Sequence, residues 1–191
     1  MTRTIPFLAL AVLLAACAEA PSMPEAASAA TAAALRRAPV TDPAQLQGIA
    51  AARRATARYH RYEAAKDTYT FLFMDMCMED DSPEQQGGMG YHYVNTALLD
   101  GEVDIAEPEA LMYEPGPDGQ RRLVGVEYVI PEGAWEGPGT PTLLGQEMEL
   151  NGFGLYALHV WLWKDNPTGI YTPWNPTVSC ANAHLVDAGA H

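Results

Sequence analysis

Two histidines, a glutamate and a methionine are the side chains of this sequence best suited to bind a metal ion. Met89 and His92 lie in the glycine-rich segment GGMGYHYVN, Glu127 lies in LVGVEYVIP, and His159 lies in LYALHVWLWK. Two imidazoles and one carboxylate are the ligands of many open zinc, iron or copper sites, where a further position stays free. A thioether from Met89 would favour copper. We therefore expect these four side chains to hold a copper or zinc ion.

The same side chains fit other interpretations, which the sequence leaves open. A histidine in an aromatic strand is often a core residue with hydrogen-bonded nitrogens, and Glu127 is a suitable partner for it. Met89 is equally suited to ordinary packing. A pocket for an apolar ligand would also use these groups. An enzyme would use His92 or His159 as a general acid or base, with Glu127 orienting it.

Established catalytic signatures are missing from the chain. It contains no GxSxG, HExxH or P-loop sequence, and no GxGxxG followed by a helix. We therefore favour a binding protein without enzymatic activity, with a small envelope enzyme as the alternative. A third class is an envelope interaction module with no small ligand, in which the tryptophans form an exposed apolar patch. Those tryptophans are Trp135, Trp161, Trp163 and Trp174.

An acidic run, Glu79-Asp80-Asp81 followed by Glu84, invites a calcium interpretation. The run lacks the alternating aspartate spacing and the closing glutamate of a calcium-binding loop. We therefore expect a solvated turn.

The first residues, MTRTIPFLALAVLLAAC, have the pattern of a secretory signal peptide. Arg3 precedes an apolar run that is too short to span a bilayer and ends in small residues. The tetrad Leu-Ala-Ala-Cys resembles a bacterial lipobox, so we expect a lipoprotein signal over residues 1–16 and acyl chains on Cys17. Conventional cleavage after an Ala-x-Ala site is the alternative. The expected location is the bacterial cell envelope, with the protein anchored to a membrane through Cys17.

Two further cysteines, Cys77 and Cys180, are expected to form a disulfide in an oxidising compartment. The bridge would close a loop of about 100 residues, which corresponds to about 4–5 kcal/mol in the chain-entropy description. A metal-bound or reactive thiol is the alternative.

The charge is distributed unevenly. Residues 67–191 contain 20 acidic and 3 basic side chains, whereas residues 26–66 contain 2 acidic and 7 basic ones. A strongly acidic body argues against nucleic acid as a partner.

The chain divides into an Ala/Pro-rich tether at residues 17–40, a single globular domain at 41–183 and a loose tail at 184–191. The tether is expected to be mostly disordered, with a transient helix as an alternative over Ala26–Arg37. A helix is expected from Asp42, an N-cap residue followed by proline, to about Lys66. Its arginines are expected either to face solvent or to pair with the acidic body.

Strands are expected after this helix, because apolar and aromatic runs alternate with turns rich in glycine and proline. In the 121–130 strand, Val124, Val126, Tyr128 and Ile130 share one face and Leu123, Glu127 and Val129 the other. The expected fold is α+β to mainly β, with an N-terminal helix packed on a mostly antiparallel, curled or barrel-like sheet. The expected strands lie at 68–76, 111–114, 121–130, 143–150 and 155–164, and the second and third form a hairpin.

Four ordered blocks resemble those of an uncharacterised group of bacterial extracytoplasmic proteins and lipoproteins. The blocks are GGMGYHYVN, PEALMYEP, LVGVEYVIP and LHVWLWKDNPTGIYTPWNPTVSC. The resemblance implies that these stretches form one domain. It carries over no activity, cofactor or catalytic residue.

Overall fold

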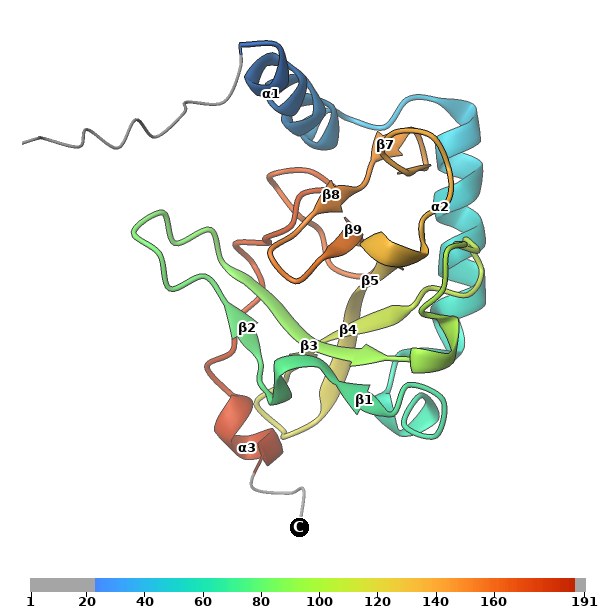
Figure 1. The fold of residues 1–191 in the computed structure, drawn as a ribbon. Helices are drawn as coiled ribbons and strands as arrows, with labels where there is room; N and C mark the ends of the chain where they lie inside the picture. The colour runs from blue at the N-terminus through green and yellow to red at the C-terminus, as the bar shows by residue number, and fades with distance from the viewer. Residues whose placement is uncertain (1–22, 188–191) are drawn as a thin grey trace, which may run out of the picture.

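The computed structural model describes residues 23–187 and shows an α+β fold built on one antiparallel sheet (Figure 1). The strand order is β1-β3-β4-β5-β9-β8, and β2 also pairs with β3. A separate two-stranded ladder joins β6 to β7. The strands are β1 Phe71–Leu72, β2 Met78–Glu79, β3 Gly88–Val94, β4 Ala110–Pro115, β5 Arg121–Pro131, β6 Thr142–Leu143, β7 Gln146–Glu147, β8 Glu149–Leu150 and β9 Leu155–Val160.

The predicted β4–β5 hairpin is confirmed. The two strands pair antiparallel across the turn-rich connector, in which Gly116 donates its N–H to the Gln120 carbonyl. The 155–164 strand is also present, but β9 ends at Val160. Beyond that residue the regular ladder stops, because the Trp161 N–H bonds to the Ile170 carbonyl, although the Trp163 N–H still bonds to the Val124 carbonyl of β5.

Two predicted strands are wrong over most of their length. In the 68–76 segment only β1 is extended, because Met74 and Asp75 adopt positive φ angles of 59° and 53° and turn the chain. The 143–150 segment is divided into short strands by a turn at Leu144 and Gly145, which also have positive φ. The sequence pattern of the 143–150 segment did not reveal this turn.

The sheet is not closed into a barrel, so the barrel-like alternative is wrong. β1 and β8 lie at opposite ends of the strand order and share no ladder. The connections beside them nevertheless meet, since Phe73 follows β1, Phe153 follows β8, and their rings lie 5.1 Å apart, edge to face. The two sheet edges are therefore close, and only side chains join them.

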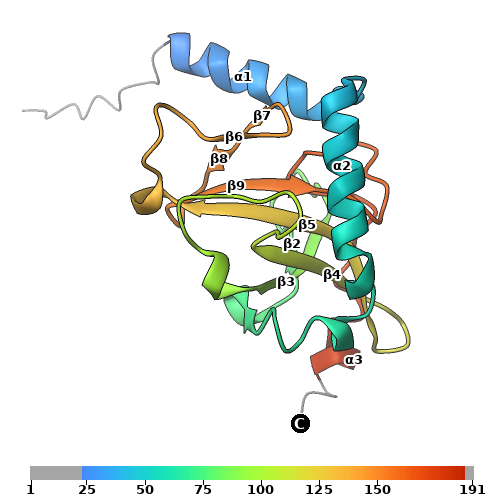
Figure 2. The ribbon, with the colours of Figure 1, turned by 90° about the vertical axis from the view of Figure 1, so that its right-hand side faces the viewer.

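The described residues contain three α-helices: α1 Met23–Arg37, α2 Pro43–Thr56 and α3 Ala183–Asp187 (Figures 1 and 2). Asp42 caps α2, its Oδ1 accepting the Ala44 N–H at 2.8 Å. The helix ends ten residues earlier than expected and continues as short 3-10 turns. There, the Leu123 N–H of β5 bonds to the His60 carbonyl. That an N-terminal helix packs on the sheet stays a prediction.

The short 3-10 helices are η1 Ala57–Tyr59, η2 Tyr62–Ala64, η3 Phe73–Asp75, η4 Thr96–Leu98 and η5 Glu132–Ala134. Within residues 23–187, no helix combines the length and apolar composition needed to cross a membrane.

The division into tether, domain and tail stays a prediction, and the described residues in these ranges include two helices. α1 occupies much of the 17–40 range, and Arg36 near its end pairs with Glu149 at 3.1 Å and donates to the Glu147 carbonyl. α3 occupies the start of the 184–191 range, and its Val186 is buried. The predicted signal peptide at 1–16 and the predicted lipidation site Cys17 lie outside the described residues.

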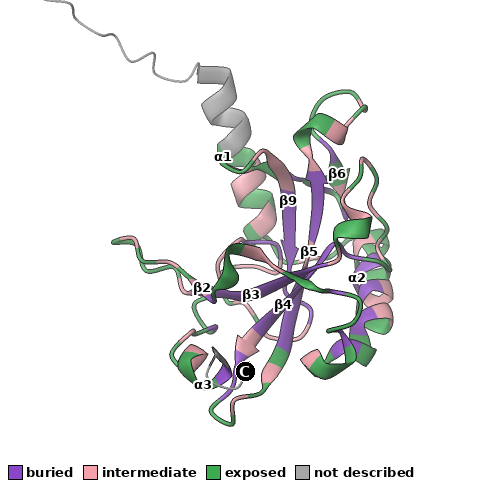
Figure 3. Cartoon of the chain, turned by 60° about the horizontal axis from the view of Figure 1, so that its bottom comes forward, coloured by how far each residue is buried: buried purple, intermediate pink, exposed green. Residues whose placement is uncertain are grey.

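One face of the sheet carries the main core, and the strands are buried along most of their length (Figure 3). Ile49 and Ala52 of α2 belong to this cluster. The predicted face of Leu123 and Val124 is reversed, because an irregularity opposite Met112 and Tyr113 shifts the register there. Leu123 joins the main core, and Val124 joins a second cluster with Met112, Trp161 and Val178. The tyrosines of the main core include Tyr91, Tyr93, Tyr113 and Tyr128.

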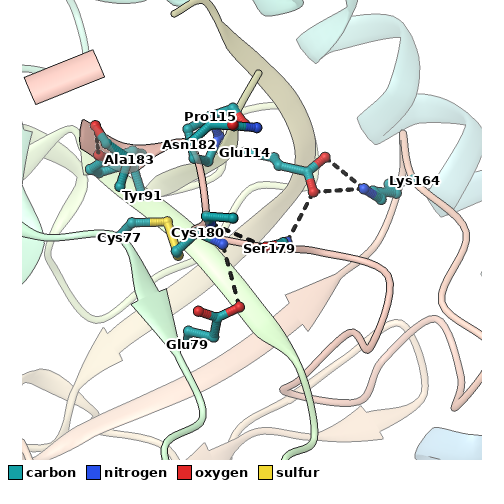
Figure 4. The surroundings of a disulfide bond; sticks show 11 residues. Cys77, Glu79, Tyr91, Glu114, Pro115, Lys164, Ser179, Cys180, Asn182 and Ala183 are labelled. Atoms are coloured by element: carbon teal, nitrogen blue, oxygen red, sulfur yellow. Dashed lines mark hydrogen bonds and ion pairs between the residues drawn. A yellow bond between two sulfur atoms is a disulfide. The ribbon is translucent and has the colours of Figure 1, made fainter. Parts of the chain in front are cut away.

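The predicted disulfide is confirmed (Figure 4). Cys77 and Cys180 are bonded across a sequence separation of 103 residues, with their Cα atoms 5.8 Å apart. The bridge ties the residue before β2 to the C-terminal segment. Beside it, Glu114 accepts hydrogen bonds from Lys164 Nζ and from the Ser179 N–H.

Candidate metal and ligand site

The face of the sheet opposite the main core borders a cavity of about 410 Å³. Strand alternation produces this separation, since His92 and Val94 of β3 line the cavity while Tyr91 and Tyr93 belong to the core. Residues of β1, β2, β3, β5, β8 and β9 form its walls together with Arg36 of α1 and several connections. Apolar side chains predominate, and among them are Phe71, Phe73, Leu99, Val129, Phe153 and Trp174.

His92, Glu127 and His159 come together at the wall of this cavity. Glu127 on β5 and His159 on β9 are direct cross-strand partners, so their side chains stand side by side. His92 lies two strands away on β3 and must reach across β4. The β4 residue paired with Glu127 is Ala110, whose methyl group leaves room for that approach.

The cluster is tight but its members are not hydrogen-bonded to one another. Glu127 Oε2 lies 3.7 Å from His92 Nε2, and Oε1 lies 3.5 Å from His159 Nε2. One potential ligand atom from each residue lies within 4.8 Å of the other two. The side chains are 3 % (His92), 13 % (Glu127) and 9 % (His159) exposed. His92 Nδ1 and His159 Nε2 are buried, and neither has a hydrogen-bond partner among the described residues.

Met89 lines the same cavity because the backbone is irregular at Gly90. In a regular strand, Met89 would share a face with Tyr91 and oppose His92. Gly90 has a φ of +83°. The side chains before and after it therefore do not alternate between the two faces of the sheet as they would in a regular strand. A side chain at Gly90 would also meet the Tyr113 carbonyl oxygen. The glycine thus explains how a methionine and a histidine three residues apart face one cavity.

Burial sets the protonation of the cluster. It lowers the pKa of His92 to about 4, although the Gly90 carbonyl acts in the opposite direction. It lowers the pKa of His159 to about 3, with a smaller contribution from His92. Burial, together with a smaller contribution from nearby Glu109, raises the pKa of Glu127 to about 8. At neutral pH the three groups therefore carry no net charge.

Glu109 is a buried carboxyl group that the sequence interpretation missed. Only 1 % of the residue is exposed, and its Oε2 accepts the Val129 N–H at 2.9 Å. Burial raises its pKa to about 7. Its position directly before the apolar run ALMY was a signal that it enters a buried strand.

Other predicted sites lie elsewhere. Asp80 of the acidic run accepts the backbone N–H groups of Ser82 and Gln86, as expected for a turn. Of the tryptophans, Trp174 lines the cavity and Trp161 is a core residue. No tryptophan is among the large apolar side chains that are strongly exposed in the described part of the chain.

Comparisons with protein-family models, with curated proteins and with solved structures found no match to this chain. The function must therefore be argued from the cavity and its cluster.

Proposed function

We propose that this protein binds a divalent transition-metal ion, zinc or copper, through His92, Glu127 and His159. The observation that carries the proposal is the convergence of two buried imidazoles and one buried carboxyl group that do not satisfy one another's hydrogen bonds. Buried polar atoms normally have partners, so a structural His/Glu network would show hydrogen bonds at this site. A metal ion would supply a partner for His159 Nε2, which is unpartnered and lies beside Glu127.

The spacing is close to that of a tetrahedral site. Ligand atoms about 2.0–2.2 Å from zinc lie roughly 3.3–3.6 Å from one another in a tetrahedron. The two His–Glu separations are 3.7 and 3.5 Å, measured to different Glu127 oxygens, and one ligand atom from each residue lies within 4.8 Å of the other two. The three side chains must therefore draw closer together around an ion. Three protein ligands leave one position toward the cavity, and Met89 on the cavity wall is a candidate for it when the ion is copper.

Metal content tests the proposal. Purified protein is dialysed against zinc or copper(II), freed of unbound ion, and analysed by mass spectrometry for metal per chain. We expect a ratio close to one, and a much lower ratio in His92→Ala and His159→Ala. His60→Ala is the matched control, because His60 is exposed and lies outside the cavity. Folded protein that takes up neither ion would contradict the proposal.

The pH dependence of binding is a second readout of the same experiment. Because the pKa of Glu127 is raised to about 8, a metal ion must displace a proton from its carboxyl group below that pH. The apparent affinity should rise about tenfold per pH unit between pH 6 and 8 and then level off. Glu127→Gln should bind more weakly and lose this slope.

An enzyme is the second candidate, favoured by the opening of the cluster onto a cavity of about 410 Å³. A protonated carboxyl group beside neutral imidazoles is suited to general acid–base catalysis near neutral pH. Metal-free protein that turns over an organic substrate, and loses turnover in Glu127→Gln, would favour this class. The tryptophan-based interaction module has no comparable support.

We also propose that the protein is exported and lipid-anchored through Cys17 in the bacterial envelope. The signal-peptide pattern and lipobox support this location, and the Cys77–Cys180 disulfide fits an oxidising compartment. The acidic composition, with a formal net charge of −13, makes nucleic acid a poor partner.

A further inference from the structure

The cavity extends well beyond the three polar side chains. A single ion needs only the cluster, whereas a volume of about 410 Å³ lies in the range of pockets that bind small organic molecules. The cavity also has two chemically distinct parts. Its polar groups are concentrated at His92, Glu127 and His159, and aromatic and aliphatic side chains form most of the remaining wall.

The aromatic side chains around the cavity come from both edges of the sheet. Phe71 belongs to β1 and Phe73 follows it, whereas Phe153 lies in the β8–β9 connection. Phe71 is 48 % and Phe153 57 % exposed, although both line the cavity. Large aromatic groups exposed in this way would lose water contact on covering an apolar molecule, which favours binding.

The polar end determines which chemical group the ligand must carry. His159 Nε2 and His92 Nδ1 are buried atoms without hydrogen-bond partners among the described residues. A head group that donates and accepts hydrogen bonds would satisfy at least one of them and the Glu127 carboxyl group. Burial disfavours a charged head group at this depth. Among the described residues that line the cavity, Arg36 is the one lysine or arginine, and its guanidinium is already paired with Glu149, so an anionic head group has little to favour it.

We propose that this cavity binds an apolar organic molecule with one uncharged hydrogen-bonding head, such as a phenol or alcohol, placed against His92, Glu127 and His159. The apolar body lies among Phe71, Phe73, Phe153 and Trp174. Binding does not require a metal ion, so this inference goes beyond the metal proposal and can stand or fall separately.

Three matched probes test the head group: 4-butylphenol, butylbenzene and 4-butylbenzoate. Their binding to the purified protein is measured by titration calorimetry at pH 7 with EDTA present. We expect 4-butylphenol to bind at least tenfold more tightly than either of the others, because one lacks the polar head and the other is charged. Equal affinities for all three, or no binding of 4-butylphenol, would overturn the proposal.

A wall substitution tests the place of binding. Ala157 is 8 % exposed and lines the cavity, so Ala157→Phe fills space there without altering the polar cluster. It should weaken 4-butylphenol binding at least tenfold. Ala106→Phe, at an exposed position outside the cavity, should not change it. Unchanged affinity in Ala157→Phe would place the probe elsewhere and overturn the proposal.

The metal and probe experiments separate the two proposals. Probe binding in EDTA by a protein that takes up no zinc or copper would remove the metal proposal and leave this one standing. Metal uptake without probe binding would remove the proposal of an organic ligand and leave the metal proposal standing. Where Ala157→Phe fails to fold, judged by its circular dichroism, Val129→Phe replaces it as a second cavity-lining variant.

Discussion

Single residues in this protein show how strongly burial alters acid–base chemistry. Glu127 and Glu109 are both buried carboxyl groups close to the same sheet face, and burial is the main cause of the raised pKa of each. Glu109 is not one of the three clustered side chains, and its Oε2 is bonded to the Val129 N–H, although its charge also raises the pKa of Glu127. Its titration can therefore be examined through stability.

Glu109→Gln should increase stability at alkaline pH relative to the parent protein. The pKa of Glu109 is raised from 4.5 to about 7, so between these values the folded state holds a proton that the unfolded state has lost. The resulting contribution to stability is complete below pH 4.5 and is lost as pH rises through 7, in total about 3 kcal/mol. Glutamine keeps an oxygen acceptor for Val129 and does not titrate.

Urea unfolding of both proteins at pH 5 and pH 8 measures this effect. The difference in free energy of unfolding between variant and parent should move in favour of the variant by about 2.5 kcal/mol from pH 5 to pH 8, because a small part of the effect is already lost at pH 5. A difference that is independent of pH would show that Glu109 ionises normally in the folded protein.

The individual site residues were predictable from their types, but their common orientation was only partly so. Alternation along regular strands correctly separates Glu127 from Tyr128 and His159 from Leu158. Alternation alone would place Met89 and His92 on opposite faces. They line one cavity because Gly90 interrupts the pattern, and the sequence does not reveal which of three neighbouring glycines does so.

At the scale of elements, long strands were predicted better than short ones. The β4–β5 hairpin has a strong turn signal between two apolar arms, so local chemistry specifies it. In the 68–76 segment, by contrast, apolar residues turn at Met74 and Asp75 and leave Phe71 exposed. Periodicity reports which residues favour burial, and it contains no information about a cavity that leaves apolar side chains uncovered.

Gly90→Ala tests whether the irregularity in β3 builds the site. The added Cβ would clash with the Tyr113 carbonyl oxygen, and a φ of +83° is unfavourable for alanine. We expect a loss of about 2–4 kcal/mol in the free energy of unfolding and weaker metal uptake. Gly133→Ala is the control, since a Cβ there has no heavy atom within 4 Å and should change stability little. Equal stability of the two variants would mean that β3 adapts to alanine.

At the scale of the whole molecule, the sheet forms an open curve whose edges approach through Phe73 and Phe153. An open sheet allows access to a cavity that a closed small barrel would fill with its own side chains. However, the edge of the sheet at β1 and β2 is held by few backbone hydrogen bonds, since each of these strands contains only two residues. The Cys77–Cys180 bridge lies next to β2, where it can compensate for that short pairing.

The disulfide should therefore support both global stability and the cavity wall. Replacing both cysteines by serine removes a cross-link over 103 residues, which corresponds to about 4–5 kcal/mol in the chain-entropy description. For a domain of this size, we expect the melting temperature to fall by roughly 8–20 °C. Met78 lines the cavity and directly follows Cys77, so 4-butylphenol should also bind more weakly.

Calorimetric unfolding with and without dithiothreitol measures the change in melting temperature. The serine variant, which must not respond to the reductant, is the control. If the parent melts within about 2 °C of the variant, the C-terminal segment is held by contacts such as Glu114 with Ser179, and the bridge is dispensable for the fold.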